Sequence, residues 1–148
     1  MKDRAITGVP GDERLSILSI SPFEDDHARL QGILGRVSKL VTAQSFSAAK
    51  KLLENQNVFL VICERDLSPS TWIECLDYIQ SVPAAPLLIV TSRLADERLW
   101  AEVLNLGGWD VLAKPFDDRE VLRTVRIAME RYRSSGEVIA KPRSMTAS

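Results

Sequence analysis

The 148-residue sequence has only two cysteines, and it lacks any apolar run long enough to cross a membrane. Cys63 and Cys75 have neither metal-binding nor redox-motif spacing, and each lies in an apolar context. We therefore expect two small buried thiols in a reducing compartment. The N-terminus lacks the apolar core of a signal peptide, so we expect a soluble cytoplasmic protein.

The sequence also lacks an excess of either charge. Lys and Arg number 19 against 20 Asp and Glu, so no global field attracts nucleic acid or a membrane surface. The hydrophobic content of 45% is ordinary for a globular protein. A chain of this length is expected to form one domain with its own core.

Short apolar runs alternate with segments of helical periodicity. Strands are expected at 15–21, 39–43, 58–63, 86–92 and 109–114. Helices are expected after Pro22 and at 47–55, 72–79, 95–106 and 116–132. The central runs are apolar at every position, which is typical of parallel strands covered on both faces. This pattern predicts an α/β fold, a doubly wound (βα)5 sheet of flavodoxin-like order 2-1-3-4-5.

Turn residues and capping patterns suggest where the domain and its helices begin and end. The polar segment 1–13 is expected to be a flexible arm, 14–133 the domain, and 134–148 a flexible tail. Ser47 is a candidate N-cap, and Gly107 is placed to terminate a helix. Asp117 and Glu120 have capping-box spacing. His27, the only histidine, is expected to be exposed or to cap a helix.

Polar side chains follow several of the predicted strands. Open parallel sheets bind ligands outside the carboxyl ends of their strands, which directs attention to Ser21-Pro22, Glu64, Thr91-Ser92 and Lys114-Pro115. The predicted order makes strands three, four and five neighbours, about 4.8 Å apart. Glu64, Thr91 and Lys114 are therefore expected to converge, with the carboxylate paired to the ammonium.

Two segments resemble the response regulator receiver domain of bacterial two-component signalling. They are "VICERDLSPSTW" and "LLIVTSRLADERLWAEVLNLGGWDVLAKPFD". The resemblance covers about Arg14 to Tyr132. It implies that Glu64 stands at the phosphoacceptor aspartate and Thr91 at the switch hydroxyl. It also implies that Lys114 is the pocket lysine and that Pro115 follows it through a cis bond.

The sequence departs from the receiver pattern in the metal-binding region. A working receiver resembles a small magnesium-dependent phosphoryl-transfer site, with an acidic pair after its first strand. Here that pair is replaced by Ser21 and Pro22, and we expect no cofactor beyond weakly held Mg²⁺. The acids Glu24, Asp25 and Asp26 are expected to open a helix, where the helix dipole favours negative charge. The alternative is a displaced metal site that uses Glu24 or Asp25.

Two further departures concern signalling itself. Val111 occupies a position that resembles the family's mobile aromatic residue, and valine has no ring to move. Glu64 is longer than aspartate by one methylene, about 1.5 Å, and errors of about 1 Å can lower a rate about 10²-fold. Glu64 can instead form a structural ion pair with Lys114 or partially mimic a phosphoaspartate. Asp66 is an alternative phosphoacceptor.

Aromatic and charged residues near the end of the domain suggest a partner surface. The candidates are Trp100, Leu104, Trp109, Asp110, Arg119, Arg123 and Arg126. In the receiver family, the face formed by the fourth helix, fifth strand and fifth helix often makes two-fold dimers. The alternatives are a buried aromatic face and a solvated charged face.

These features predict a stand-alone, non-enzymatic, atypical receiver that acts through protein contacts. A histidine kinase, another regulator, an output protein or a second copy of the chain are the candidate partners. The 15 residues from Ser134 onward are too few for a helix-turn-helix. One alternative is a receiver still phosphorylated on Glu64 or Asp66 with weakly held Mg²⁺. A remote alternative is a flavodoxin-like enzyme or cofactor carrier, although "SISPFEDDH" offers no glycine and several acids at the expected phosphate loop.

Overall fold

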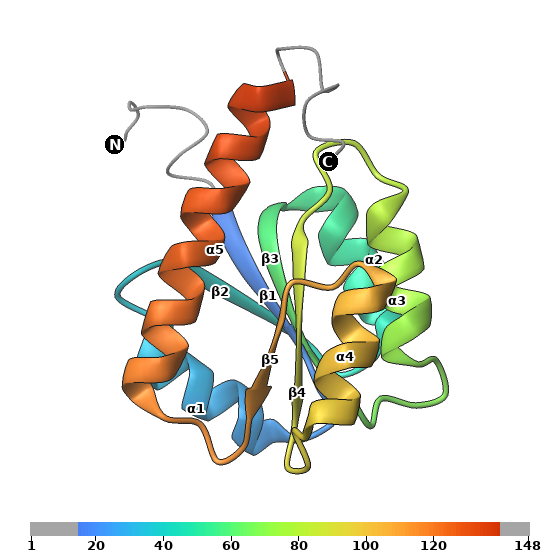
Figure 1. Cartoon of the computed structure of the whole chain (residues 1–148), viewed down its shortest axis with the longest axis vertical. Helices are drawn as coiled ribbons and strands as arrows, with labels where there is room; N and C mark the ends of the chain where they lie inside the picture. Colours follow the sequence, from blue (N-terminus) through green and yellow to red (C-terminus); the bar gives the residue numbers. More distant parts are fainter. Residues whose placement is uncertain (1–14, 140–148) are drawn as a thin grey trace.

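The computed structural model describes residues 15–139 and shows a five-stranded parallel sheet (Figure 1). The strands lie in the order β2-β1-β3-β4-β5, which confirms the predicted fold class. Their bounds are β1 Leu15–Ile20, β2 Lys39–Ala43, β3 Asn57–Glu64, β4 Leu87–Ser92 and β5 Asp110–Ala113. In the order 2-1-3-4-5, strand order reverses between β1 and β3, and a crevice opens there at the carboxyl ends of the strands.

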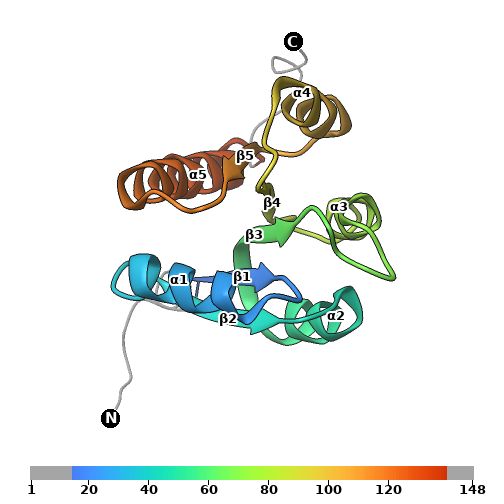
Figure 2. The ribbon, with the colours of Figure 1, turned by 90° about the horizontal axis from the view of Figure 1, so that it is seen from below.

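Five helices cover the two faces of the sheet. Figure 2 shows α1 and α5 on one face and α2, α3 and α4 on the other. Their bounds are α1 Glu24–Leu34, α2 Phe46–Asn55, α3 Trp72–Gln80, α4 Glu97–Leu106 and α5 Asp118–Ile139. Because both faces are covered, the central strands must be apolar on both sides.

Two hydrophobic cores, one on each face, follow from the alternation of side chains along β3. Val61 and Cys63 belong to the core beneath α2, α3 and α4. Leu60 and Ile62 belong to the core beneath α1 and α5, and the register shift that skips Phe59 places this residue in the same core. Every β3 residue from Val58 to Glu64 is buried, so the continuous apolar run of the sequence reflects burial on two sides.

The helix ends confirm some capping predictions and correct one. The α2 N-cap is Ser45, not Ser47, because the Ser45 hydroxyl accepts the Ala48 N–H at 3.1 Å. The predicted roles of Gly107 and Asp117 are confirmed. Gly107 ends α4 with a left-handed φ of 106°, a conformation that glycine adopts without strain. The Asp117 carboxylate accepts the Glu120 N–H at 2.9 Å.

Helix α5 is longer than the sequence suggested. It continues through residues 134–139, so the predicted start of a tail at Ser134 is wrong for this part. Serine and glycine weaken a helix without stopping it, and the first proline after α5 is Pro142. The predicted arm at 1–13 and the rest of the tail, 140–148, lie outside the described residues. No helix in the described part is both long and apolar enough to span a membrane.

Candidate functional site

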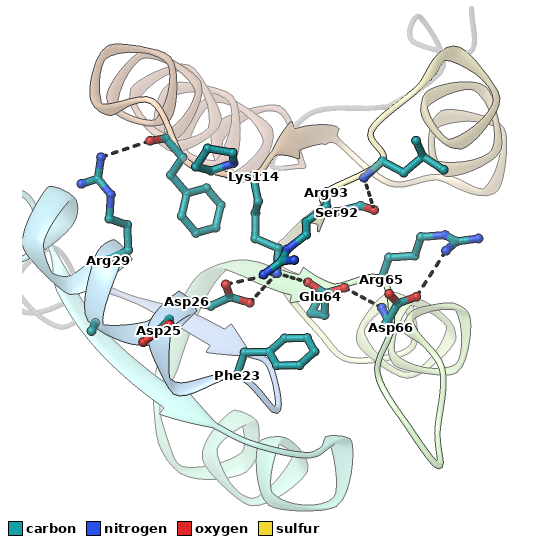
Figure 3. A pocket seen from close by; sticks show the side chains of 14 residues that line it. Phe23, Asp25, Asp26, Arg29, Glu64, Arg65, Asp66, Ser92, Arg93 and Lys114 are labelled. Carbon is teal, nitrogen blue, oxygen red and sulfur yellow. Dashed lines mark hydrogen bonds and ion pairs between the residues drawn. The ribbon is translucent and has the colours of Figure 1, made fainter.

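A pocket of about 1210 Å³ opens at the carboxyl edge of the sheet (Figure 3). Three elements place charged groups on its floor. Glu64 is the last residue of β3, Lys114 directly follows β5, and Asp26 lies in the first turn of α1. Phe23 and Leu94, which are 48% and 68% exposed, contribute apolar lining. The pocket therefore combines a charged floor with apolar walls.

The ion pair expected between Glu64 and Lys114 is present. Lys114 Nζ lies 2.5 Å from Glu64 Oε1, and the Glu64 residue is only 2% exposed. The second carboxylate oxygen, Oε2, accepts the backbone N–H of Asp66 at 2.8 Å. Both oxygens of Glu64 therefore have hydrogen-bond donors supplied by the chain itself.

Asp26 is a second partner of Lys114, and the sequence analysis missed it. Its Oδ2 and Oδ1 atoms lie 2.8 and 3.1 Å from Lys114 Nζ. The acidic cluster does open α1, as expected. Because that first turn follows directly after the tip of β1, the Asp26 side chain also reaches the edge where Glu64 and Lys114 meet. The only signal in the sequence was the position of Asp26 in the first helical turn after the first strand.

The electrostatic surroundings of Lys114 favour its charged form. Burial alone would lower the pKa of Lys114, since only 9% of its side chain is exposed. Hydrogen bonds and charge attraction from Asp26 and Glu64 outweigh that effect and raise the pKa above its ordinary value of 10.5. Lys114 is therefore a cation throughout the physiological pH range.

The two residues after β1 do not supply metal-binding carboxylates. The Ser21 hydroxyl donates a hydrogen bond to Asp26 Oδ2 at 2.7 Å, and Pro22 is exposed. The carboxylates of Asp26 and Glu64 are already paired with Lys114. Mg²⁺ requires about six oxygens, and among residues 15–139 no group of three or more acidic, histidine or cysteine side chains could hold a metal ion. The residues do not fit the magnesium centre that the resemblance implies.

His27 is buried, contrary to the expectation of an exposed or capping residue. It is 4% exposed, and its two ring nitrogens each lie 2.9 Å from an oxygen of the β1 region. Nε2–H donates to the Ser21 carbonyl, because a carbonyl can only accept. Nδ1 pairs with the Ser19 hydroxyl. The histidine thus fixes the backbone at Ser21, whose side chain holds Asp26.

The structure places Thr91 next to Glu64, its register partner across the β3–β4 pairing, as the predicted convergence requires. Ser92 lines the pocket, whereas Thr91 does not. Side chains alternate along β4, so Thr91 shares the face of Ile89, which packs under α1 and α5. Ser92 shares the face of Val90, beneath α2, α3 and α4. Glu64 follows Ile62 of the core beneath α1 and α5 by two residues, so Glu64 and Thr91 share one face of the sheet and Ser92 lies on the other.

The remaining receiver-like positions lie near the pocket or behind it. The Lys114–Pro115 bond is cis, as the resemblance implied, and Pro115 lines the pocket. Val111 is partly buried and packs against the core beneath α4. The Asp66 side chain is exposed and pairs with Arg65 at 3.2 Å. Glu24 is exposed, while Asp25 lies at the rim of the pocket.

The predicted partner surface is only partly exposed. Trp100 is 51% exposed, and Leu104 is half-buried. Trp109 packs against the core beneath α5, with Arg131 5.7 Å from its ring. The charged members Arg119, Arg123 and Arg126 are exposed, and Asp110 is half-buried. Leu106, the last residue of α4, is 44% exposed.

Comparison with solved structures identifies similar folds. The signal receiver domain of an HD domain-containing protein from Pseudomonas fluorescens is 30% identical, with a TM-score of 0.77. That comparison covers 89% of this chain and 97% of the other. The signal receiver domain of a Luxo repressor protein from Vibrio parahaemolyticus has the same TM-score at 16% identity, covering 84% and 97% of the two chains. The second likeness concerns the fold alone.

Curated relatives are more distant and longer. The transcriptional regulatory protein CpxR homolog of Haemophilus influenzae is 28% identical over 78% of this chain and 52% of its own length. The regulatory protein VirG of Rhizobium rhizogenes is 23% identical over 64% of this chain and 38% of its own length. The chain thus spans about half or less of these relatives. No protein-family model matches it.

The fold and the site together define an α/β receiver-type domain, with an acid and a lysine at the carboxyl edge of a 2-1-3-4-5 sheet. The chain belongs to the response regulator receiver domain family of two-component signalling.

Proposed function

We propose that this protein is an atypical cytoplasmic receiver that signals through protein contacts without being phosphorylated. The Glu64–Lys114 ion pair carries the proposal. A phosphoryl group on a receiver would need the cation of Lys114 and the backbone N–H of Asp66 as anion donors. Glu64 already accepts from both of these groups, so its carboxylate takes the place of an added anion.

The residues that would pass a change in the pocket on to β5 also differ from those of a switching receiver. The Ser92 hydroxyl accepts the Leu94 N–H at 3.0 Å, within its own loop. Between residues 15 and 139 no hydrogen bond joins the hydroxyl of Thr91 or of Ser92 to Glu64. Val111 offers no aromatic ring to follow a movement of Thr91. These features support a single resting conformation rather than a phosphorylation-driven pair of states.

Incubation with a small-molecule phosphodonor and Mg²⁺ is expected to leave the protein unmodified. Intact mass spectrometry measures the result, and a typical receiver with an aspartate at this position serves as the positive control. The physical reason is that Glu64 is buried and both of its oxygens are already hydrogen-bonded. A stoichiometric gain of one phosphoryl group would refute the proposal.

The second candidate function is a receiver still phosphorylated, on Glu64 or on Asp66. Its support is the exposure of Asp66, whose carboxylate is accessible to a donor. Glu64→Gln and Asp66→Asn variants separate the two acceptors if any phosphoryl gain is seen. Loss of the gain in only one variant identifies the residue.

The partner is proposed to be a protein, either a histidine kinase, another regulator or output protein, or a second copy of the chain. The surface is centred on Trp100 of α4, together with β5 and the arginines of α5. Exposed tryptophan and arginine are the residue types most often found at energetic centres of interfaces. In a two-fold dimer, opposite charges of this face would be exchanged between copies.

Trp100→Ala is expected to weaken self-association by about ten-fold or more, because truncating a central tryptophan often costs 2 kcal/mol or more. Sedimentation over a range of protein concentrations measures the dissociation constant. Val37→Ala, an exposed valine just beyond α1, is the matched control and should have no effect. Self-association unchanged by Trp100→Ala, or a monomer at all concentrations, would rule out the homodimer through this surface.

A further inference from the structure

The ammonium of Lys114 is surrounded by carboxylate oxygens from two different elements. Two oxygens of Asp26, on α1, lie 2.8 and 3.1 Å from Nζ, and Oε1 of Glu64, on β3, lies 2.5 Å from it. An ammonium has three N–H donors, so all of them can be used within this cluster. The side chains are 9%, 10% and 2% exposed for Lys114, Asp26 and Glu64, so the ammonium offsets one of the two negative charges in a place removed from bulk water.

One oxygen of each carboxylate also accepts a hydrogen bond from another group of the chain. Asp26 Oδ2 accepts the Ser21 hydroxyl at 2.7 Å, and Glu64 Oε2 accepts the Asp66 N–H at 2.8 Å. Ser21 itself is fixed by His27, whose Nε2–H donates to the Ser21 carbonyl at 2.9 Å. The position that would carry a metal-binding carboxylate in a typical receiver thus carries a hydrogen-bond donor directed at Asp26.

The wall beside the ammonium also suits an organic cation better than a hydrated metal ion. The ring of Phe23 lies 5.0 Å from Lys114 Nζ, a cation–π distance. Mg²⁺ keeps several water molecules and requires oxygen ligands in near-octahedral positions. An aromatic face supplies no such ligand, and it disfavours bound water beside the ion.

We infer that Lys114 is the resident counter-cation of this pocket and that it bridges Asp26 and Glu64 in place of a divalent metal ion. The inference rests on the proposed phosphorylation-independent function and deepens it. An ammonium and a divalent ion would compete for the same oxygens, because the two buried carboxylates of the cluster cannot balance three positive charges. The two occupants are therefore mutually exclusive.

The test measures divalent-cation binding after the resident cation is removed. Melting temperatures of wild type and Lys114→Ala are recorded with MgCl₂, MnCl₂ or CaCl₂, against NaCl at equal ionic strength. Lys114→Ala is expected to gain a saturable increase of about 5 °C at about 10 mM divalent salt, because the ion neutralises two buried carboxylates. Wild type is expected to show no increase beyond the NaCl control.

Two further variants make the result specific. Lys114→Arg keeps the positive charge and should not respond to divalent ions. Lys114→Ala/Asp26→Asn lacks one of the two carboxylates and should lose the response. If Lys114→Ala fails to fold, Lys114→Met, which keeps the length of the side chain, is refolded with and without each salt and followed by circular dichroism. Recovery of helical signal only with divalent ions supports the inference.

Two outcomes would overturn the inference: no saturable response to any of the three cations in Lys114→Ala or Lys114→Met, or an equal response in wild type. Neither outcome involves phosphoryl transfer, so the proposed function would stand. Conversely, a phosphoryl gain in the mass experiment would overturn the proposed function. The role of Lys114 as counter-cation would then still be judged by the divalent-cation experiment alone.

Discussion

Lys114→Met is expected to lower the free energy of unfolding by about 3–5 kcal/mol, the usual cost of removing one partner from a buried ion pair. The substitution removes the only cation bonded to Asp26 and Glu64 in the described structure, and it leaves two buried carboxylates close together. Methionine has a similar length, so loss of packing is a minor part of the effect. Urea denaturation of both proteins measures the difference.

Arg93→Met is the matched control for this prediction. Arg93 lines the same pocket and is exposed, and within the described residues its side chain has no ion pair or hydrogen bond. The same change of residue type there should alter stability by no more than about 0.5 kcal/mol. A loss below about 1 kcal/mol for Lys114→Met would mean that the cluster is not a buried charge network.

The difference between wild type and Lys114→Met should also depend on pH in one direction. The pKa of Lys114 is raised in the folded protein above 10.5 by Asp26 and Glu64. The folded state therefore holds this proton more tightly than the unfolded state. The contribution of Lys114 to the free energy of unfolding is fully present below its pKa in the unfolded state, near 10.5. This contribution is lost as the pH rises through the higher pKa of the folded state. The stability difference between wild type and Lys114→Met should therefore shrink only as the pH rises above 10.5.

Phe59→Ala is expected to destabilise the domain by about 3–5 kcal/mol, comparable with Lys114→Met but for a different reason. Phe59 is fully buried in the core beneath α1 and α5, and its ring lies 6.0 Å from that of Tyr132 on α5. Removal of the ring leaves a cavity between β3 and α5. Denaturation midpoints and slopes measure the change, with Phe59→Leu as the milder control at about 1 kcal/mol.

Phe59→Ala also separates loss of stability from loss of the charge cluster. Phe59 lies five residues before Glu64 on the same strand, about 16 Å away. Under conditions in which the variant stays folded, it should bind partners as wild type does and should show no response to divalent ions. A divalent-ion response in Phe59→Ala would mean that destabilisation alone opens the pocket. A stability loss below about 1.5 kcal/mol would contradict the packing of the ring.

The sequence by itself determined the order of elements and most of the residues that reach the edge of the sheet. Runs such as Val58–Cys63, apolar at every position, specify strands buried on both faces, which requires a parallel sheet between two layers of helices. That arrangement sends the residues after each strand to one edge. The meeting of Glu64 and Lys114 follows from chain order and sheet topology.

Only the tertiary structure decided which side chains at that edge form ion pairs with one another. Local sequence explains Asp26 as a helix-opening acid, and it cannot show that the first turn of α1 is rotated so that this carboxylate reaches Lys114. The register places Thr91 beside Glu64 as chain order predicts, whereas only the structure shows that Ser92, on the opposite face of β4, also lines the pocket. His27 was misplaced because its burial depends on Ser19 and Ser21 of β1 and the following loop. Helical periodicity and capping are local, whereas hydrogen bonds across elements depend on how those elements are rotated and spaced.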